Sequence, residues 1–192
     1  MSCHISMNVR CLLWRKGVPR SGWLAELARR TGLPRARINS FLNGDTDDAA
    51  LEQHEVAMLA EIVGLGEEAD HLRHAGYALD DCDVLSENLR YLLNSLGRGG
   101  KKALAGDLGV DPTTLSRWLN GSFVPQTSTL RQLVSNFGLP PNTDLEEDPI
   151  FLSAEPISAT ERRSWLHGRI EDLQADELRA LYPALRRLLE ER

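Results

Sequence analysis

The sequence predicts an all-α protein with two similar helix-turn-helix units and a helical tail. Apolar residues recur at the three- and four-residue spacing of helices. Glycine and proline divide the chain into short segments. The segment 23–44 also recurs 77 residues later, which indicates an internal repeat. A chain of 192 residues has room for two such units of about 55–60 residues each.

The clearest motif lies between residues 101 and 139. A first short helix is predicted to end at Gly109, because glycine tolerates the left-handed backbone of a helix C-terminus. Asp111 can cap the next helix, and Pro112 suits its first position. Asn120-Gly121 ends that helix. Two short helices joined by a glycine turn form a helix-turn-helix, whose second helix can enter the major groove of DNA. The apolar positions that define the two helices are Leu104, Ala105, Leu108, Leu115, Trp118 and Leu119.

The same pattern occurs earlier in the chain, which predicts a tandem repeat. Gly32 corresponds to Gly109, and Phe41 corresponds to Trp118. Upstream, the sequence NVRCLL from Asn8 resembles NLRYLL from Asn88. In the first unit we expect helices at 8–16, 23–30, 34–43 and 49–63, and in the second unit helices near 87–95 and 127–137 flank the motif. The predicted domains are 1–66, an acidic connector 67–86, 87–150 and a helical segment 151–192.

The tail is predicted to hold two helices. Ser158 and Glu161 form a capping box that opens the first, which runs to about residue 173. The second starts near Asp176, and Pro183 is expected to kink it or begin a new helix. Leu178, Leu181, Leu185 and Leu188 have the spacing of a short coiled-coil seam. This seam predicts either a homodimer or docking on the protein's own units.

The net charge of −6 argues against DNA binding, but the basic residues are concentrated in two segments that could bind DNA. Residues 9–44 carry +7 and residues 98–131 carry +3, whereas 45–97 carry −11 and 132–192 carry −5. Salt screens charges beyond about 8 Å, so phosphate attraction acts locally. Basic patches on the two units can therefore bind DNA while the acidic stretches face away.

Both units resemble the lambda-repressor-like (Cro/repressor, Xre) helix-turn-helix family. The second unit matches the family pattern from Leu104 to Pro125, including the run LSRWLNG. The resemblance implies that double-stranded DNA is the partner, that the residue opening the first motif helix contacts phosphate, and that the second helix reads bases. Carried onto this chain, the DNA-binding residues are Lys101, Lys102, Pro112, Thr113, Thr114, Ser116, Arg117 and Asn120 in the second unit. In the first unit they are Arg35, Ala36, Arg37, Asn39, Ser40 and Asn43.

The first unit departs from the family pattern in two ways. Asp45, Asp47 and Asp48 follow its reading helix, where the family often has basic residues, and they are expected to repel DNA. Leu33 precedes Pro34, so that helix has no polar cap. We expect both units to contact DNA, with the better motif in the second. The function that the sequence predicts is a sequence-specific transcriptional regulator, a repressor that occludes its promoter.

The sequence also allows other interpretations. An antitoxin-like or other interaction protein would use one or both units for packing or for binding a protein partner. His71, His74 and Cys82 could hold a metal, as could Cys3, His4 and Cys11, but the spacing matches no standard finger, and we expect no metal and no cofactor. No phosphate loop or nucleophile elbow is present, so we expect no enzyme. All four tryptophans are expected in the core.

The composition fits a cytoplasmic protein. The hydrophobic content of 42% predicts a folded chain rather than a disordered one. Three cysteines without a pairing pattern are typical of a reducing compartment. No apolar run approaches the roughly 20 residues that a membrane-spanning helix needs. The N-terminal sequence has no secretory signal.

Overall fold

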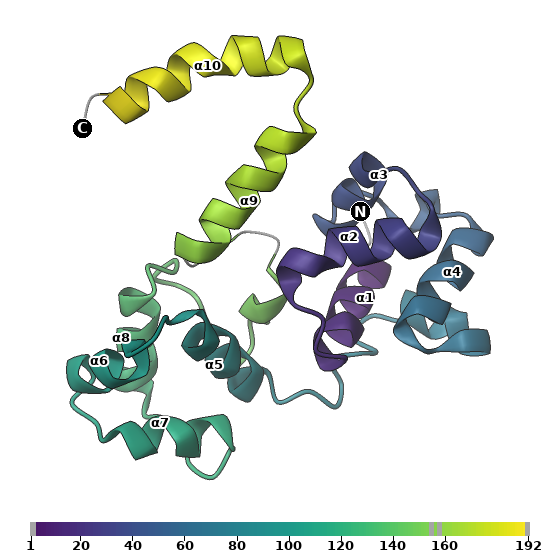
Figure 1. Cartoon of the computed structure of the whole chain (residues 1–192). Coiled ribbons are helices and arrows are strands. Elements are labelled where there is room, and N and C mark those ends of the chain that lie inside the picture. Colours follow the sequence, from purple (N-terminus) through teal and green to yellow (C-terminus); the bar gives the residue numbers. More distant parts are fainter. Residues whose placement is uncertain (1–2, 154–155, 157–158, 191–192) are drawn as a thin grey trace. The chain divides into compact units, whose positions relative to one another are not determined.

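The computed structural model of this protein describes residues 3–153, 156 and 159–190, and within these ranges it is helical without strands, which confirms the predicted all-α class. The chain divides into two compact units, residues 1–155 and 156–192 (Figure 1). The first, here called the body, contains two halves. Its helices are α1 (His4–Arg15), α2 (Arg20–Thr31), α3 (Arg35–Leu42), α4 (Gln53–Val63), α5 (Val84–Ser95), α6 (Gly100–Asp107), α7 (Pro112–Leu119) and α8 (Thr127–Asn136), with 3-10 turns at Asp48–Ala50, Gly66–Arg73 and Ile150–Leu152.

The two halves of the body have the same order of elements. In each, a first helix (α1 or α5) is followed by two short helices joined by a tight turn and then by a fourth helix. Gly32 (φ 69°) and Gly109 (φ 66°) form those turns in the left-handed conformation, as the sequence predicted. Asp111 accepts a hydrogen bond from the Thr113 N–H at 2.8 Å and caps α7.

A buried asparagine ties the end of the first half to its beginning. Asn8, which is fully buried in α1, donates from Nδ2 to the carbonyl oxygens of Leu72 (2.9 Å) and His74 (2.8 Å). Its Oδ1 accepts from the N–H of Ala78 at 3.0 Å. These bonds hold residues 66–82, here called the first return segment, against α1. The segment that the sequence analysis took for a connector is therefore folded on the first half, and Leu72 in it is fully buried.

The second half repeats this arrangement. Asn88, fully buried in α5, donates from Nδ2 to the carbonyl oxygens of Leu145 (2.9 Å) and Asp148 (2.7 Å). Its Oδ1 accepts from the Phe151 N–H at 3.2 Å. The second return segment, residues 140–153, is thereby folded back on α5. Each asparagine bonds two carbonyl oxygens and one N–H of its return segment, and the carbonyls of His74 and Asp148 also accept from the N–H groups of Tyr77 and Ile150.

The two halves meet where the second return segment lies against α1. The ring of Trp14 packs on Phe151 at 5.5 Å and edge-on against Tyr91 at 5.9 Å, measured between ring centroids. Its Nε1 donates to the Glu87 carboxylate at 2.7 Å. The buried Arg10 donates to the carbonyl oxygen of Leu152 at 2.6 Å. This interface buries aromatic surface and satisfies its polar groups, so it joins the halves into one body.

The guanidinium of Arg20 strengthens the same interface. It lies 4.8 Å from the centroid of the Tyr91 ring, donates to the Tyr91 hydroxyl and donates to the carbonyl oxygen of Ser153. A cation over an aromatic face adds a favourable electrostatic contact. Arg20 belongs to the basic segment 9–44, whose charge was expected to attract DNA, but it is engaged between the halves.

The C-terminal unit contains α9 (Ala159–Asp172) and α10 (Ala175–Glu190). The α10 helix continues through Pro183, so the alternative in which a new helix begins there was wrong. Ser158 lies outside the described residues, as does the side chain of Glu161, so the predicted capping box is not described. Trp165 was expected in the core and is 49% exposed, so that prediction was wrong. Across the described residues, no helix is both long and apolar enough to cross a membrane.

Candidate nucleic-acid interface

The α7 helix presents a polar row opposite its buried face. Leu115 and Trp118 are 2% and 3% exposed and anchor one side of the helix in the second half. The opposite side exposes most of the residues that the sequence assigned to DNA, namely Pro112, Thr113, Ser116, Arg117 and Asn120, with Thr114 half-buried at its edge. A helix anchored on one side and polar on the other can enter a major groove.

The first turn of α7 is closed by an acidic cap, Asp111. Hydrogen bonds from the side chain and backbone of Thr113 lower the pKa of Asp111, so the cap stays ionised and held in place. The hydroxyl of Thr113 donates to that carboxylate at 2.7 Å. Arg117 stands one turn further on, and its guanidinium offers two parallel donors that match the O6 and N7 atoms of guanine.

Lys101 and Lys102 open α6 and are exposed. Among the described residues, neither lysine forms an ion pair or a side-chain hydrogen bond with another part of the chain, and both ammonium groups are therefore available to phosphates. Arg98 and Arg131 are exposed and equally unengaged, although the sequence analysis did not include them. Their charge was counted in residues 98–131, but both lie outside the family pattern from Leu104 to Pro125.

In the corresponding helix of the first half, α3, the best candidate for contacting a base is Arg37, and it is already in an ion pair. Arg37 forms an ion pair with Glu55 of α4 at 2.8 Å. Glu55 is 3% exposed and also accepts from the Glu52 N–H at 3.0 Å. Burial raises the pKa of Glu55, but the Glu52 N–H and the Arg37 guanidinium lower it more, so the net shift is downward. Removing Arg37 from this pair would leave a buried carboxylate without its counterion.

The remaining predicted residues of the first half lie around α3. Arg35 and Ala36 are exposed in the first turn, and Asn43 is exposed at the C-terminus. Asn39 is half-buried, and so is Ser40, whose hydroxyl lies 3.2 Å from that of Thr46. The predicted DNA-binding residues of the first half thus lie on or next to α3, but fewer of their polar side chains are exposed than on α7.

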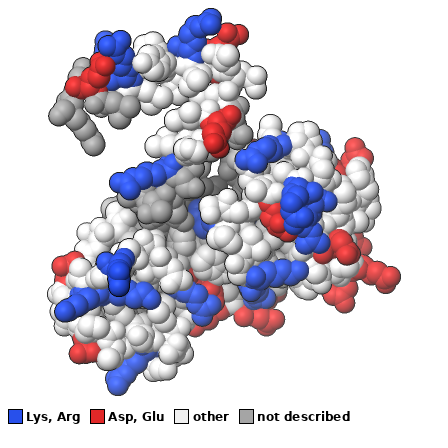
Figure 2. All heavy atoms as spheres, in the orientation of Figure 1, with Lys and Arg blue, Asp and Glu red and all other residues white. Residues whose placement is uncertain are grey.

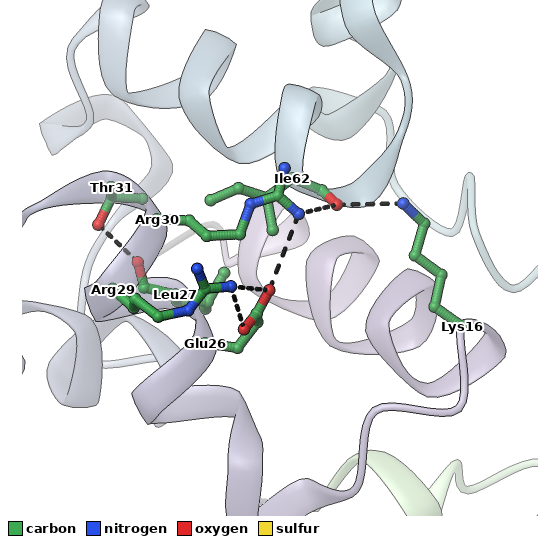
Figure 3. A network of polar contacts seen from close by, with 7 residues as sticks. All are labelled: Lys16, Glu26, Leu27, Arg29, Arg30, Thr31 and Ile62. Carbon is green, nitrogen blue, oxygen red and sulfur yellow. Dashed lines mark hydrogen bonds and ion pairs between the residues drawn. The ribbon is translucent and has the colours of Figure 1, made fainter.

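Further basic side chains of the first half also contact their own half (Figure 3). Lys16 of the α1–α2 turn donates to the carbonyl oxygen of Ile62 at 3.1 Å, and Arg30 donates to the same oxygen at 3.4 Å. Arg29 pairs with Glu26 at 2.8 Å. Exposed pairs of this kind contribute little to stability. The charge of +7 in this part of the sequence therefore overstates what is available to DNA.

The acidic loop after α3 has a structural role that the sequence analysis missed. Asp48 is 7% exposed and accepts hydrogen bonds from the N–H groups of His4 (2.8 Å) and Ile5 (3.2 Å) at the start of α1. Asp47 caps the following 3-10 turn through Ala49. The expectation that Asp48 faces and repels DNA was therefore wrong, because a carboxylate at a helix N-terminus is stabilising. Asp45 is exposed, as expected.

The charges of the body are distributed unevenly (Figure 2). Blue basic side chains dominate the surface formed by α6, α7 and α8, while red acidic side chains gather around α4 and the first return segment. This agrees with the local excess of positive charge in residues 98–131. A positive surface beside a polar helix is what a polyanionic duplex requires.

The histidines and cysteines considered as metal ligands do not gather into a metal site. Within the described part of the chain, no group of three His, Cys, Asp or Glu side chains could hold a metal ion. The ring of His71 instead packs on Tyr77, with 4.9 Å between centroids. Cys11 is fully buried, and its thiol donates to the carbonyl oxygen of Ala78 at 3.2 Å.

Comparison with known proteins supports a helix-turn-helix in the second half of the body. A search of curated proteins and one of solved structures gave no match. A protein-family model described as Helix-turn-helix, which is of the lambda-repressor-like class, matches residues 98–143. The matched residues contain α6, α7 and α8, together with every residue assigned to DNA in the second half. This part of the chain is therefore similar to the helix-turn-helix domains that the model describes.

Proposed function

We propose that the protein is a sequence-specific, double-stranded DNA-binding transcriptional regulator and not an enzyme, and that α7 is its reading helix. The observation that carries the proposal is the exposed row on α7, from Pro112 to Asn120, which lies in the matched domain next to unengaged lysines. Arg117 reads guanine through its two parallel donors, while Thr113 and Ser116 contact phosphates or base edges. Lys101 and Lys102 contribute sequence-independent affinity.

The first half is proposed as a second copy of the same domain. Its basic side chains contact other parts of the protein and do not read DNA bases. The shared order of helices and the matching asparagine bonds of Asn8 and Asn88 support the duplication. The pair between Arg37 and Glu55 and the engagement of Arg20 between the halves support the loss of reading. The first half alone is therefore proposed to serve in packing and not in reading DNA.

The mechanism of regulation that we propose is occlusion. A body of about 150 residues bound across a promoter excludes other proteins from the same groove, so the regulator acts as a repressor without needing a catalytic group. Phosphate contacts set the affinity and orientation, and the α7 side chains set the sequence. The exclusion is strongest where the bound site overlaps the promoter itself.

The proposal is tested by selecting a preferred duplex from a random library with the full-length protein. A single enriched motif is expected, and titrations at several salt concentrations should show affinity falling steeply with salt. Lys101→Ala should weaken binding to all duplexes alike and reduce the salt slope by about one. Lys16→Ala is the matched control, because that lysine already donates to the Ile62 carbonyl. Failure to enrich any motif would favour the interaction-protein alternative.

A further inference from the structure

An acidic side chain lies beside the polar row of α7. Asp111 is the only acidic residue between Leu108 and Thr143, and it is exposed at the N-cap of the helix. A carboxylate at this place lowers the affinity of the surface for a polyanion such as DNA. Asparagine and serine cap helices about as well and carry no charge. The cap therefore does not require the charge that Asp111 brings.

The carboxylate of Asp111 is held by one oxygen, and its other oxygen is available. Its Oδ1 accepts from the N–H of Thr113 at 2.8 Å and from the Thr113 hydroxyl at 2.7 Å. Within the part of the chain that the structure describes, Oδ2 accepts no hydrogen bond. Thr113 belongs to the exposed row of α7, so these bonds place the carboxylate at the N-terminal end of that row. The hydrogen bonds from Thr113, and after them the charge of Arg117, lower the pKa of Asp111, so the group is ionised at neutral pH.

We propose that Asp111 is a specificity-determining residue, whose Oδ2 accepts a hydrogen bond from the exocyclic amino group of a base in the major groove. This inference rests on the proposed reading role of α7. The bases that present such a donor there are cytosine, through N4, and adenine, through N6. Guanine and thymine present oxygen acceptors at the corresponding edge, and a carboxylate repels them. Asp111 therefore selects cytosine or adenine, and disfavours guanine and thymine, at one position of the bound site.

Asp111 and Arg117 then read DNA by opposite rules. The guanidinium of Arg117 offers donors that suit guanine, whereas the carboxylate of Asp111 offers an acceptor that suits cytosine or adenine. The N-terminal residues of a reading helix are the ones that contact base edges, and Asp111 lies at that end of α7. Six residues separate the two side chains along the chain, so they read different base positions. A carboxylate in this place reduces the general affinity for DNA and increases the discrimination between sequences.

The test is selection of duplexes from a random library by the full-length protein, by Asp111→Ser and by Asp111→Asn. The motif of the unmodified protein should contain a position at which cytosine or adenine is preferred over guanine and thymine by about 5- to 150-fold. Asp111→Ser keeps a capping residue and should lose this preference. Asp111→Asn should favour adenine at the same position, because an asparagine amide matches N6 and N7 of adenine. The base that the unmodified protein selects distinguishes cytosine from adenine as the natural partner.

A role in capping alone predicts a different result. Weakening the cap should reduce binding to the selected and to a scrambled duplex by the same factor, with the base preferences unchanged. The proposal predicts instead that Asp111→Ser binds the scrambled duplex at least as tightly as the unmodified protein, because a negative charge has been removed. Asp47→Ser is the matched control, since Asp47 caps a 3-10 turn of the first half through the Ala49 N–H, and it should leave the motif unchanged.

The outcomes separate this inference from the proposed function. If the unmodified protein enriches a motif and Asp111→Ser keeps every base preference of that motif, the inference is overturned and the proposed function stands. If the unmodified protein enriches no motif, both are overturned. Circular dichroism should show that Asp111→Ser and Asp111→Asn have the helix content of the unmodified protein, because serine and asparagine both cap helices.

Discussion

The asparagine of α5 provides a quantitative prediction about stability. Asn88→Ala removes both hydrogen bonds donated to the carbonyls of Leu145 and Asp148 and the one accepted from the Phe151 N–H. The Leu145 carbonyl and the Phe151 N–H lie in buried residues, where each unsatisfied group costs about 1–3 kcal/mol. Asp148 is exposed, so water can replace its partner. The expected loss is therefore about 2–6 kcal/mol, a large fraction of the 5–15 kcal/mol typical of a domain.

Urea denaturation followed by circular dichroism measures this loss directly. Asn94→Ala is the matched control, because Asn94 lies on the exposed side of the same helix and should change stability by less than about 0.5 kcal/mol. Asn8→Ala should cost a similar amount to Asn88→Ala, since Asn8 makes the same three bonds in the first half. A loss below about 1 kcal/mol for Asn88→Ala would refute the reasoning that this residue holds the second return segment.

Two further predictions concern groups whose pKa the fold shifts. Glu55→Gln should cost about 1–3 kcal/mol of stability at pH 7, because it weakens the pair with Arg37. The folded pKa of Glu55 is lowered, so its contribution is present above the unfolded value of about 4.3 and is lost as pH falls through the folded value. Denaturation at pH 7 and pH 3 should therefore show the two proteins converging; an unchanged gap contradicts this. Burial raises the pKa of Cys11 to about 12, so its alkylation by iodoacetamide at pH 8, followed by mass spectrometry, should be at least about 10-fold slower than that of the more accessible Cys3; equal rates would contradict the buried position.

Local patterns in the sequence predicted most of the helices, although α1 and α2 begin earlier than expected, at His4 and Arg20, and α4 begins later, at Gln53. The expected helix at 34–43 corresponds to α3 at Arg35–Leu42, and the cap at Asp111 forms as predicted. These features depend on residues a few positions apart, whose preferences are largely local. The predicted row on α7 is exposed for the same reason, because Leu115 and Trp118 fix which side of the helix is buried.

Contacts between distant residues could not be predicted in this way. The partner of Arg10 is 142 residues away, and Asp48 caps a helix 43 residues before it. Charge counting treated both side chains as available to solvent. The asparagines were a usable sign that was missed: Asn8 and Asn88 begin the matching runs NVRCLL and NLRYLL in two similar helices, and a buried polar side chain must have partners.

The central claim is that α7, and not α3, reads DNA. The measurement that tests it most directly is a titration of the selected duplex and a scrambled duplex with Arg117→Ala and with Arg37→Ala, each first shown to be folded. We expect Arg117→Ala to lose about 1–3 kcal/mol of binding free energy and to discriminate less between the duplexes. Arg37→Ala should bind within about twofold of the unmodified protein, because Arg37 is already paired with Glu55. The opposite result, with Arg37→Ala losing selectivity and Arg117→Ala unchanged, would contradict the assignment of the reading helix.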